Sequence, residues 1–141
     1  MRVLSFRELH WHHSPDGASL KDAVRPAPHP DRAGLLAYLR SGWCFAARPL
    51  VVPDYLRPER EMVSTSHWYT DGEWIWPTDL IYYVEEYHAE LPAEFAARMA
   101  SFGWSCPQLS QGEKCSVADW WVRWRETGGA ERGAAPGRPR D

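Results

Sequence analysis

The stretch TDGEWIWPTDLIYYVEEYHAELPAEF, residues 70–95, decides the fold of this 141-residue chain. TDG is a turn signal, and the strand-forming residues that follow it end at Pro77, which the interior of a strand does not tolerate. Proline suits the first turn of a helix, where its missing N–H is not needed. Residues at the i, i+3, i+4, i+7 spacing of a helical stripe come next: Leu80, Tyr83, Val84 and Tyr87. The stretch therefore predicts a strand that leads directly into an amphipathic helix.

Upstream of the turn, residues 62–69 are rich in strand-forming residues, and we expect them to pair with residues 73–76 as an antiparallel hairpin. Because side chains alternate along a strand, Trp74 and Trp76 are expected to share one face, with Ile75 on the other. Tryptophan serves both in cores and at protein interfaces. The sequence alone therefore leaves both locations open for the two tryptophans.

Further helices are predicted on either side of this stretch. One covers residues 31–41, where leucines form an apolar stripe. Another begins at Pro92 and turns three apolar residues inward: Phe95, Met99 and Phe102. A third covers residues 117–126, after a pattern typical of a capping box at Ser116 and Asp119. Each of these helices has one apolar side to bury against the sheet.

The remaining segments predict shorter elements. Residues 43–47, WCFAA, are apolar enough for a buried strand that contains Cys44. Residues 49–58 carry three prolines and are expected to be a loop, because proline breaks a strand ladder. The start of the chain predicts a short strand, and Ser19 with Asp22 predicts a short helical turn.

Together these elements predict an α+β fold in a single domain, residues 1–127, with a small antiparallel sheet of about three strands packed with three to four helices. Residues 128–141 are rich in Gly, Pro and Arg and are expected to form a disordered tail. The three cysteines lack CxxC spacing and no signal segment precedes them, which predicts a reduced, cytoplasmic protein. No apolar run reaches the roughly 18 to 20 residues of a membrane helix, so we expect a soluble protein.

Charge is distributed unevenly along the chain. The net charge is −3, yet residues 54–94 hold ten acidic and two basic residues, a net charge of −8. A segment of one sign over this length predicts a field that steers a basic partner. It argues against nucleic acid, because phosphate binding requires a basic surface. We therefore expect a basic protein partner, while the oligomeric state stays open.

Three chemical readings compete for the polar residues. The HWHH motif would place His10 and His12 on one strand face, as two zinc ligands, but no further Cys or His completes a site with it or with His13. Paired carboxylates such as Asp79 and Glu86 could work as general acid and base in a small hydrolase. The serines lack the GxSxG context of a nucleophile. We expect no metal, no cofactor and no catalytic residue.

Residues 71–95 resemble a recurrent block of small bacterial proteins of uncharacterised activity, many of them actinobacterial. In that block D-G-x-W-x-W-P-x-D-L-x-Y-Y-V is followed by Y-H-x-x-L-P-x-x-F. The matching positions are Asp71, Gly72, Trp74, Trp76, Pro77, Asp79, Leu80, Tyr82, Tyr83, Val84, Tyr87, His88, Leu91, Pro92 and Phe95. The resemblance implies a role beside a secreted toxin, as the immunity protein of a toxin–antitoxin pair, and it brings no catalytic residues with it.

These observations favour a non-catalytic protein-binding module, in the form of a cytoplasmic immunity protein that blocks a basic toxin domain. The residues expected to contact the partner are Asp71, Glu73, Trp74, Trp76, Asp79, Tyr82, Glu85 and Glu86. The alternatives are a small hydrolase that uses Asp79 and Glu86, or an accessory regulatory subunit. Aromatic anchors would supply most of the affinity in a binding module, and the acidic residues would speed association.

Overall fold

The central hairpin forms as the sequence predicts. In the computed structural model, which describes residues 1–12 and 14–127, β5 (Trp68–Thr70) pairs antiparallel with β6 (Trp74–Pro77), and Tyr69 lies opposite Trp76. The turn between the two strands places Gly72 at a φ of 101°, a conformation that favours glycine. Thr78 follows β6 immediately and begins α3 (Thr78–Tyr87). The stretch that decides the fold is therefore a hairpin continuous with a helix.

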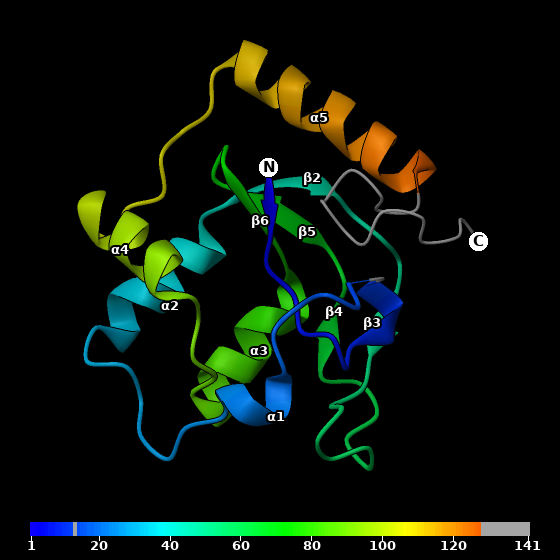
Figure 1. Ribbon diagram of the computed structural model, residues 1–141, viewed down its shortest axis with the longest axis vertical. Helices are drawn as coiled ribbons and strands as arrows, with labels where there is room; N and C mark the ends of the chain where they lie inside the picture. The colour runs from blue at the N-terminus through cyan, green and yellow to red at the C-terminus, as the bar shows by residue number, and fades with distance from the viewer. Residues whose placement is uncertain (13, 128–141) are drawn as a thin grey trace.

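Two more strands complete the sheet. β2 (Trp43–Ala46) pairs antiparallel with β5, and β1 (Arg2–Val3) pairs parallel with β6, which gives the order β1-β6-β5-β2 (Figure 1). Three strands are antiparallel, as predicted, and the parallel β1 makes the sheet mixed. The fold is α+β.

A separate two-stranded sheet joins β3 (Val51–Val52) to β4 (Ser64–Thr65). The prediction of a loop without a ladder at residues 49–58 was therefore wrong at Val51 and Val52. Val51 and Val52 lie between Pro49 and Pro53. Both valines keep their own backbone N–H groups, so the prolines on either side do not interrupt the pairing. The long strand expected at residues 62–69 is divided into β4 and β5. Its first part pairs with β3 and its last part pairs with β6.

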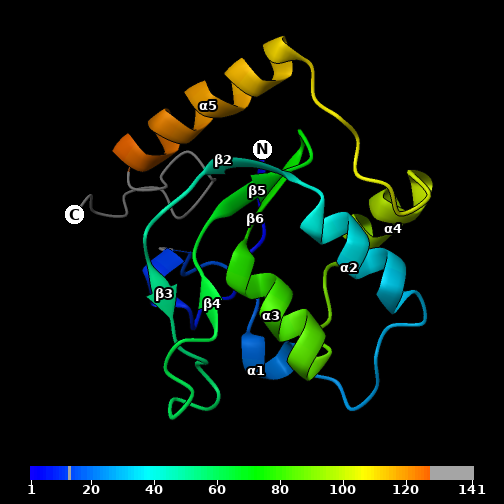
Figure 2. The same cartoon turned by 180° about the vertical axis from the view of Figure 1, so that it is seen from behind.

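The helices flank the sheet on several sides. They are α1 (Leu20–Ala23), α2 (Arg32–Arg40), α3, α4 (Ala93–Ser101) and α5 (Gln111–Glu126), with a 3-10 turn, η1 (His10–His12), near the start. Figures 1 and 2 show α2 and α4 side by side on one flank and α5 along β2. None of the described helices combines the length and apolar character needed to cross a bilayer. The predicted tail, residues 128–141, lies outside the described residues.

Both tryptophans of β6 belong to the core. The rings of Trp74 and Trp76 contact Phe95 of α4 at centroid distances of 5.0 and 5.5 Å, and both are buried. Trp76 Nε1 donates to the carbonyl of Leu39 in α2 at 3.0 Å. Ile75 is buried on the opposite face of the strand. The sheet is thus covered on both faces, and the question that the sequence left open is answered in favour of the core.

Three details differ from the sequence-based expectations. Phe102 is exposed because α4 ends at Ser101 and the chain turns at Gly103, whose φ is 62°. The last helix starts at Gln111, six residues earlier than expected, because Ser110 and Glu113 form the capping box. Cys44 is exposed, since β2 is an edge strand of the sheet.

Candidate functional site

The eight residues predicted to contact a partner fall into two groups of four. Asp71, Trp74, Trp76 and Asp79 are at most 3% exposed. Glu73, Tyr82, Glu85 and Glu86 lie at or near the surface. The first four cannot form a contact surface in this structure, and that part of the prediction was wrong. Their surroundings explain why.

Asp71 holds the turn of the hairpin against two helices. Its Oδ1 accepts the backbone N–H groups of Glu73 and Trp74 at 3.0 and 2.8 Å. Its Oδ2 accepts the hydroxyl of Tyr38 at 2.6 Å and Nε of Arg98 at 2.9 Å. Burial, followed by the hydrogen bond to Asp71, raises the pKa of Tyr38. The carboxylate is therefore fully engaged in joining β6 to α2 and α4.

Asp79 is buried in the first turn of α3, where a negative charge is favoured by the helix dipole. Its two oxygens lie 2.8 and 2.9 Å from Nε2 of His12, which is also buried, and Trp11 Nε1 donates to Oδ2 at 3.0 Å. Both partners come from the N-terminal segment, far away in sequence. Asp79 therefore does not join Tyr82 and Glu86 at the surface, as the expected contact set requires.

The histidine motif does not form a strand face. His12 lies in the 3-10 turn η1, and its ring contacts Trp68 in the interior at a centroid distance of 5.1 Å. His13 and the side chain of His10 are outside the described part of the structure. Over residues 1–12 and 14–127 no group of three or more His, Cys, Asp or Glu side chains is arranged to hold a metal ion.

A third buried carboxylate, Asp54, was not among the predicted site residues. Leu56 and Arg57 donate their backbone N–H groups to Oδ1, and the hydroxyls of Tyr82 and Tyr87 donate to Oδ2. Burial alone would raise the pKa of Asp54, but these four hydrogen bonds outweigh burial and hold the pKa below its ordinary value of 3.8. The sequence did contain a signal for this role. An aspartate in a proline-rich loop commonly accepts the backbone N–H groups two and three residues further on, as Asp54 does.

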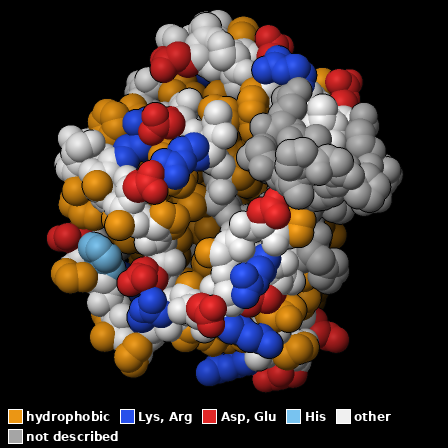
Figure 3. Space-filling model, viewed as in Figure 1, with side chains coloured by type: hydrophobic (Ala, Val, Ile, Leu, Met, Phe, Trp, Pro, Cys, Tyr) orange, Lys and Arg blue, Asp and Glu red, His pale blue; other side chains and the backbone are white. Residues whose placement is uncertain are grey.

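The acidic middle segment is largely neutralised in the folded chain. Ion pairs join Glu73 to Arg98, Glu85 to Arg40 and Glu86 to Arg60. Two more pairs join Arg2 to Glu94 and Arg25 to Glu90. Figure 3 shows basic and acidic side chains in contact at several places on one face. The expected one-sign field is therefore a surface of mixed charge, because four arginines from outside the acidic segment, Arg2, Arg25, Arg40 and Arg98, pair with its glutamates, and Arg60 pairs within it.

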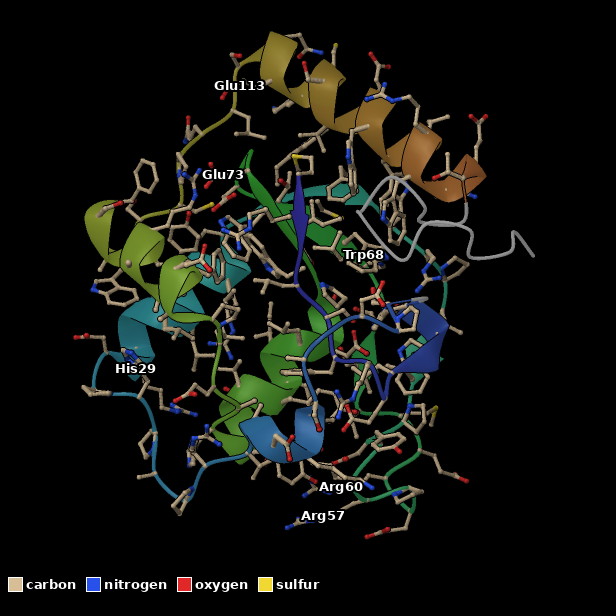
Figure 4. The ribbon with its side chains drawn as sticks, viewed as in Figure 1. His29, Arg57, Arg60, Trp68, Glu73 and Glu113 are labelled. Atoms are coloured by element: carbon tan, nitrogen blue, oxygen red, sulfur yellow. The ribbon has the colours of Figure 1, made fainter. Side chains whose placement is uncertain are left out.

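The exposed half of the predicted site is itself divided. Figure 4 shows Glu73 at the tip of the hairpin and Arg60 at the opposite end of the molecule. Tyr82 and Glu86 both belong with Arg60, whose Nη1 donates to the Tyr82 hydroxyl at 2.8 Å and lies 3.9 Å from Glu86. Glu73 therefore does not belong to the same surface as Tyr82, Glu85 and Glu86.

Tyr82 and Glu85 line an open groove of about 260 Å³ between α3, β4 and the end of α2. We call it the α3 groove, and its lining residues are Arg40, Val63, Ser64, Tyr69, Thr78, Ile81, Tyr82 and Glu85. Phenol rings, hydroxyl groups and one carboxylate surround it. Such a lining suits an inserted Lys or Arg side chain, which gains from both a carboxylate and an aromatic face.

The carboxylate pair of the hydrolase hypothesis is not brought together. Asp79 and Glu86 are seven residues apart on α3, a rise of roughly 10 Å along the helix axis. Asp79 is closed off in the core, whereas the Glu86 side chain is 47% exposed. A general acid and base must both reach one substrate, and this pair does not share a cavity in the described residues.

Comparison of the chain with protein-family models, with curated proteins and with solved structures finds no match.

Proposed function

We propose that the protein is a non-catalytic binding module, a cytoplasmic immunity protein that blocks a basic toxin domain at the α3 groove. The observation that carries the proposal is that Tyr82 and Glu85 line this open groove, while Glu86 lies beside it at Arg60, which also donates to the Tyr82 hydroxyl. These three are the members of the predicted contact set that the fold leaves accessible on one surface. In this proposal a basic side chain of the partner enters the groove.

The ion pairs beside the groove can exchange partners at small cost. Arg40 and Glu85 are 52% and 43% exposed in their pair, and Arg60 and Glu86 are 42% and 47% exposed. Exposed pairs of this kind contribute about 0 to 1 kcal/mol. A partner's Lys or Arg can therefore replace Arg40 or Arg60 at the glutamates, and the displaced arginine returns to water.

Binding is favoured over catalysis by the state of the other carboxylates. Asp54, Asp71 and Asp79 are buried and satisfied by donors of the chain itself. Glu85, the acidic group of the α3 groove, lies on an open surface, where water is not excluded. Open, hydrated surfaces suit electrostatic recognition, in which charge complementarity speeds association and selects the partner.

The experiment takes the genes adjacent to this chain's gene, expresses any basic domain that they encode, and measures its affinity for this chain by titration calorimetry; absence of such a domain would count against the immunity role. The test variant is Glu85→Lys with Glu86→Lys, and the matched control is Asp119→Lys, an exposed acidic residue of α5. We expect the double variant to weaken binding at least tenfold and the control to leave it unchanged. Equal affinity of all three proteins would place the contact surface elsewhere, and lack of binding by the wild-type chain would reject the immunity role.

A further inference from the structure

A larger cavity, of about 550 Å³, lies at the N-terminal end of α2. It is enclosed by the loop of residues 25–30, the end of α3 and the starts of α2 and α4, and we call it the proline pocket. Figure 4 shows His29 on this loop, between α1 and α2. The walls are mainly apolar, through Pro26, Pro28, Pro30, Leu35, Val84 and Leu91. Its volume is within the range of small-molecule sites, about 300 to 1,000 Å³.

Two helices begin at this pocket. Arg32 and Leu35 of the first turn of α2 line it, as do Ala93 and Ala96 of the first turn of α4. Neither Asp31 nor Pro92, the two N-cap residues, provides a side-chain cap in the described structure. The first N–H groups of an α-helix have no partner within the helix and carry a partial positive charge. The N–H of Arg32 already donates to the carbonyl of His29, and that of Phe95 to the carbonyl of Pro92, so the two helix ends favour an anionic group mainly through their partial positive charge.

One basic side chain reinforces this preference. Arg25, His29, Arg32 and His88 contribute to the lining, but Nδ1 of His29 accepts the backbone N–H of Asp31 at 2.9 Å, so the positive charge free to meet a ligand is that of Arg32. Glu90 also lines the pocket, but Arg25 holds it at 2.9 Å. Arg32 makes one long hydrogen bond, 3.3 Å from Nη2 to the carbonyl of Glu85, and so has further donors to offer. The pocket is accordingly apolar in its walls and cationic at its edge.

His88 adds an independent observation. Its Nδ1 is buried and finds no hydrogen-bond partner among the described residues, although the ring lines the pocket. A neutral imidazole carries one proton, and an N–H buried without an acceptor is costly. The proton is therefore favoured on Nε2. His88 is also the residue that ends α3, and its φ of 54° is the left-handed conformation in which many helices end.

We propose that the proline pocket binds a small monocarboxylic acid with an apolar body. The carboxylate is received by the helix N-termini and Arg32, and the apolar body packs on the prolines, Leu35 and Val84. A neutral apolar molecule would leave the cationic edge unused, and a small inorganic anion would leave the apolar walls in contact with water. This site is separate from the α3 groove and does not depend on the function proposed above.

The test titrates the full chain with octanoate and follows backbone amide resonances by NMR. We expect saturable shifts of residues around the pocket, and at least tenfold weaker binding of octanamide, which has the same body without the charge. Arg32→Gln should weaken octanoate binding several-fold. Saturation without preference for the acid, or no shift with octanoate in the millimolar range, would overturn the proposal.

Two further variants separate occupancy of the pocket from general effects. Ala93→Phe places a ring at the pocket and should abolish octanoate binding, whereas Ala97→Phe, an exposed residue of α4 outside the lining, should not. Thermal unfolding of both variants checks that the fold is retained.

A second experiment uses a peptide with a free C-terminal leucine and its amidated form. Binding of the free peptide alone, without octanoate binding, would assign the site to a protein C-terminus and reject the small acid.

Discussion

The hydroxyl of Tyr38 donates a 2.6 Å hydrogen bond to Asp71, and this contact fastens α2 to the turn of the β5–β6 hairpin. Arg98 of α4 reaches the same carboxylate oxygen, so two helices and the hairpin meet at one buried charge. In the sequence, Asp71 is part of the most acidic segment of the chain. Its role in the fold is instead to satisfy two side-chain donors and two backbone N–H groups at once.

Loss of the Asp71 charge should therefore destabilise the protein strongly. In Asp71→Asn the amide nitrogen faces Tyr38 and Arg98, both of which are donors. We expect a loss of about 3 kcal/mol in the free energy of unfolding, at the low end for a buried pair because Arg98 keeps contact with water. Urea denaturation measures the difference. Glu73→Gln in the same turn is the control, with an expected loss below about 1 kcal/mol, since its pair with Arg98 is exposed. Similar losses for both would contradict the assigned role.

Acid sensitivity should depend on Asp54. Its pKa is lowered in the folded protein, so its contribution to stability is fully present above the ordinary value of 3.8 and is lost as the pH falls through the lower folded value. We expect Asp54→Asn to be less stable than the wild type at neutral pH and to lose less stability on acidification. Thermal midpoints measured from neutral pH to below 3.8 test this. Parallel curves for the two proteins would show that Asp54 does not titrate as described.

The parts of the fold that the sequence predicts correctly depend on local signals. Pro77 marks the change from strand to helix, and helical spacing identifies the buried side of α3, where Leu80, Tyr83 and Val84 are all buried. Turn and capping residues act over three or four positions, so they can be recognised without knowledge of the tertiary structure. The same holds for the short helix after Ser19, whose side chain accepts the N–H of Asp22.

The candidate site was harder to predict because its charges are balanced by distant residues. His12 lies 67 positions from Asp79, and Tyr38 lies 33 positions from Asp71. Nothing near Asp71 or Asp79 in the sequence indicates these donors, and an acidic residue without a visible partner was expected at the surface. The parallel pairing of β1 with β6 is equally non-local, with Arg2 opposite Trp74. Tertiary contacts, not local pattern, determine which acidic residues stay accessible.

Thiol reactivity should distinguish the three cysteines. Burial, with a further contribution from the charge of Asp71, raises the pKa of Cys106 to about 11, which keeps it protonated at neutral pH. Cys44 and Cys115 are exposed. We expect the native protein to react quickly with Ellman's reagent at two thiols and slowly at the third, and the unfolded protein to react at all three. Cys106→Ser should remove the slow phase alone, and loss of a fast phase in this variant would contradict the assignment.

Two helical glycines should respond to alanine in opposite directions. A Cβ added to Gly34 in α2 would lie 2.6 Å from Cγ of Trp104, so the indole must move. Trp104 has little freedom to do so, because its backbone is held at a φ of 63° directly after Gly103. At Gly112 in α5 the nearest atom is the Ser110 hydroxyl oxygen, at 3.9 Å, which leaves room for a methyl group. We expect Gly34→Ala to lower the free energy of unfolding by about 1 to 3 kcal/mol. Gly112→Ala should raise it by about 0.5 to 1 kcal/mol, because alanine restricts the unfolded chain and favours the helix. Urea denaturation of both variants, followed by tryptophan fluorescence, gives the two values, and a gain in stability for Gly34→Ala would mean that Trp104 does not pack on α2 in solution.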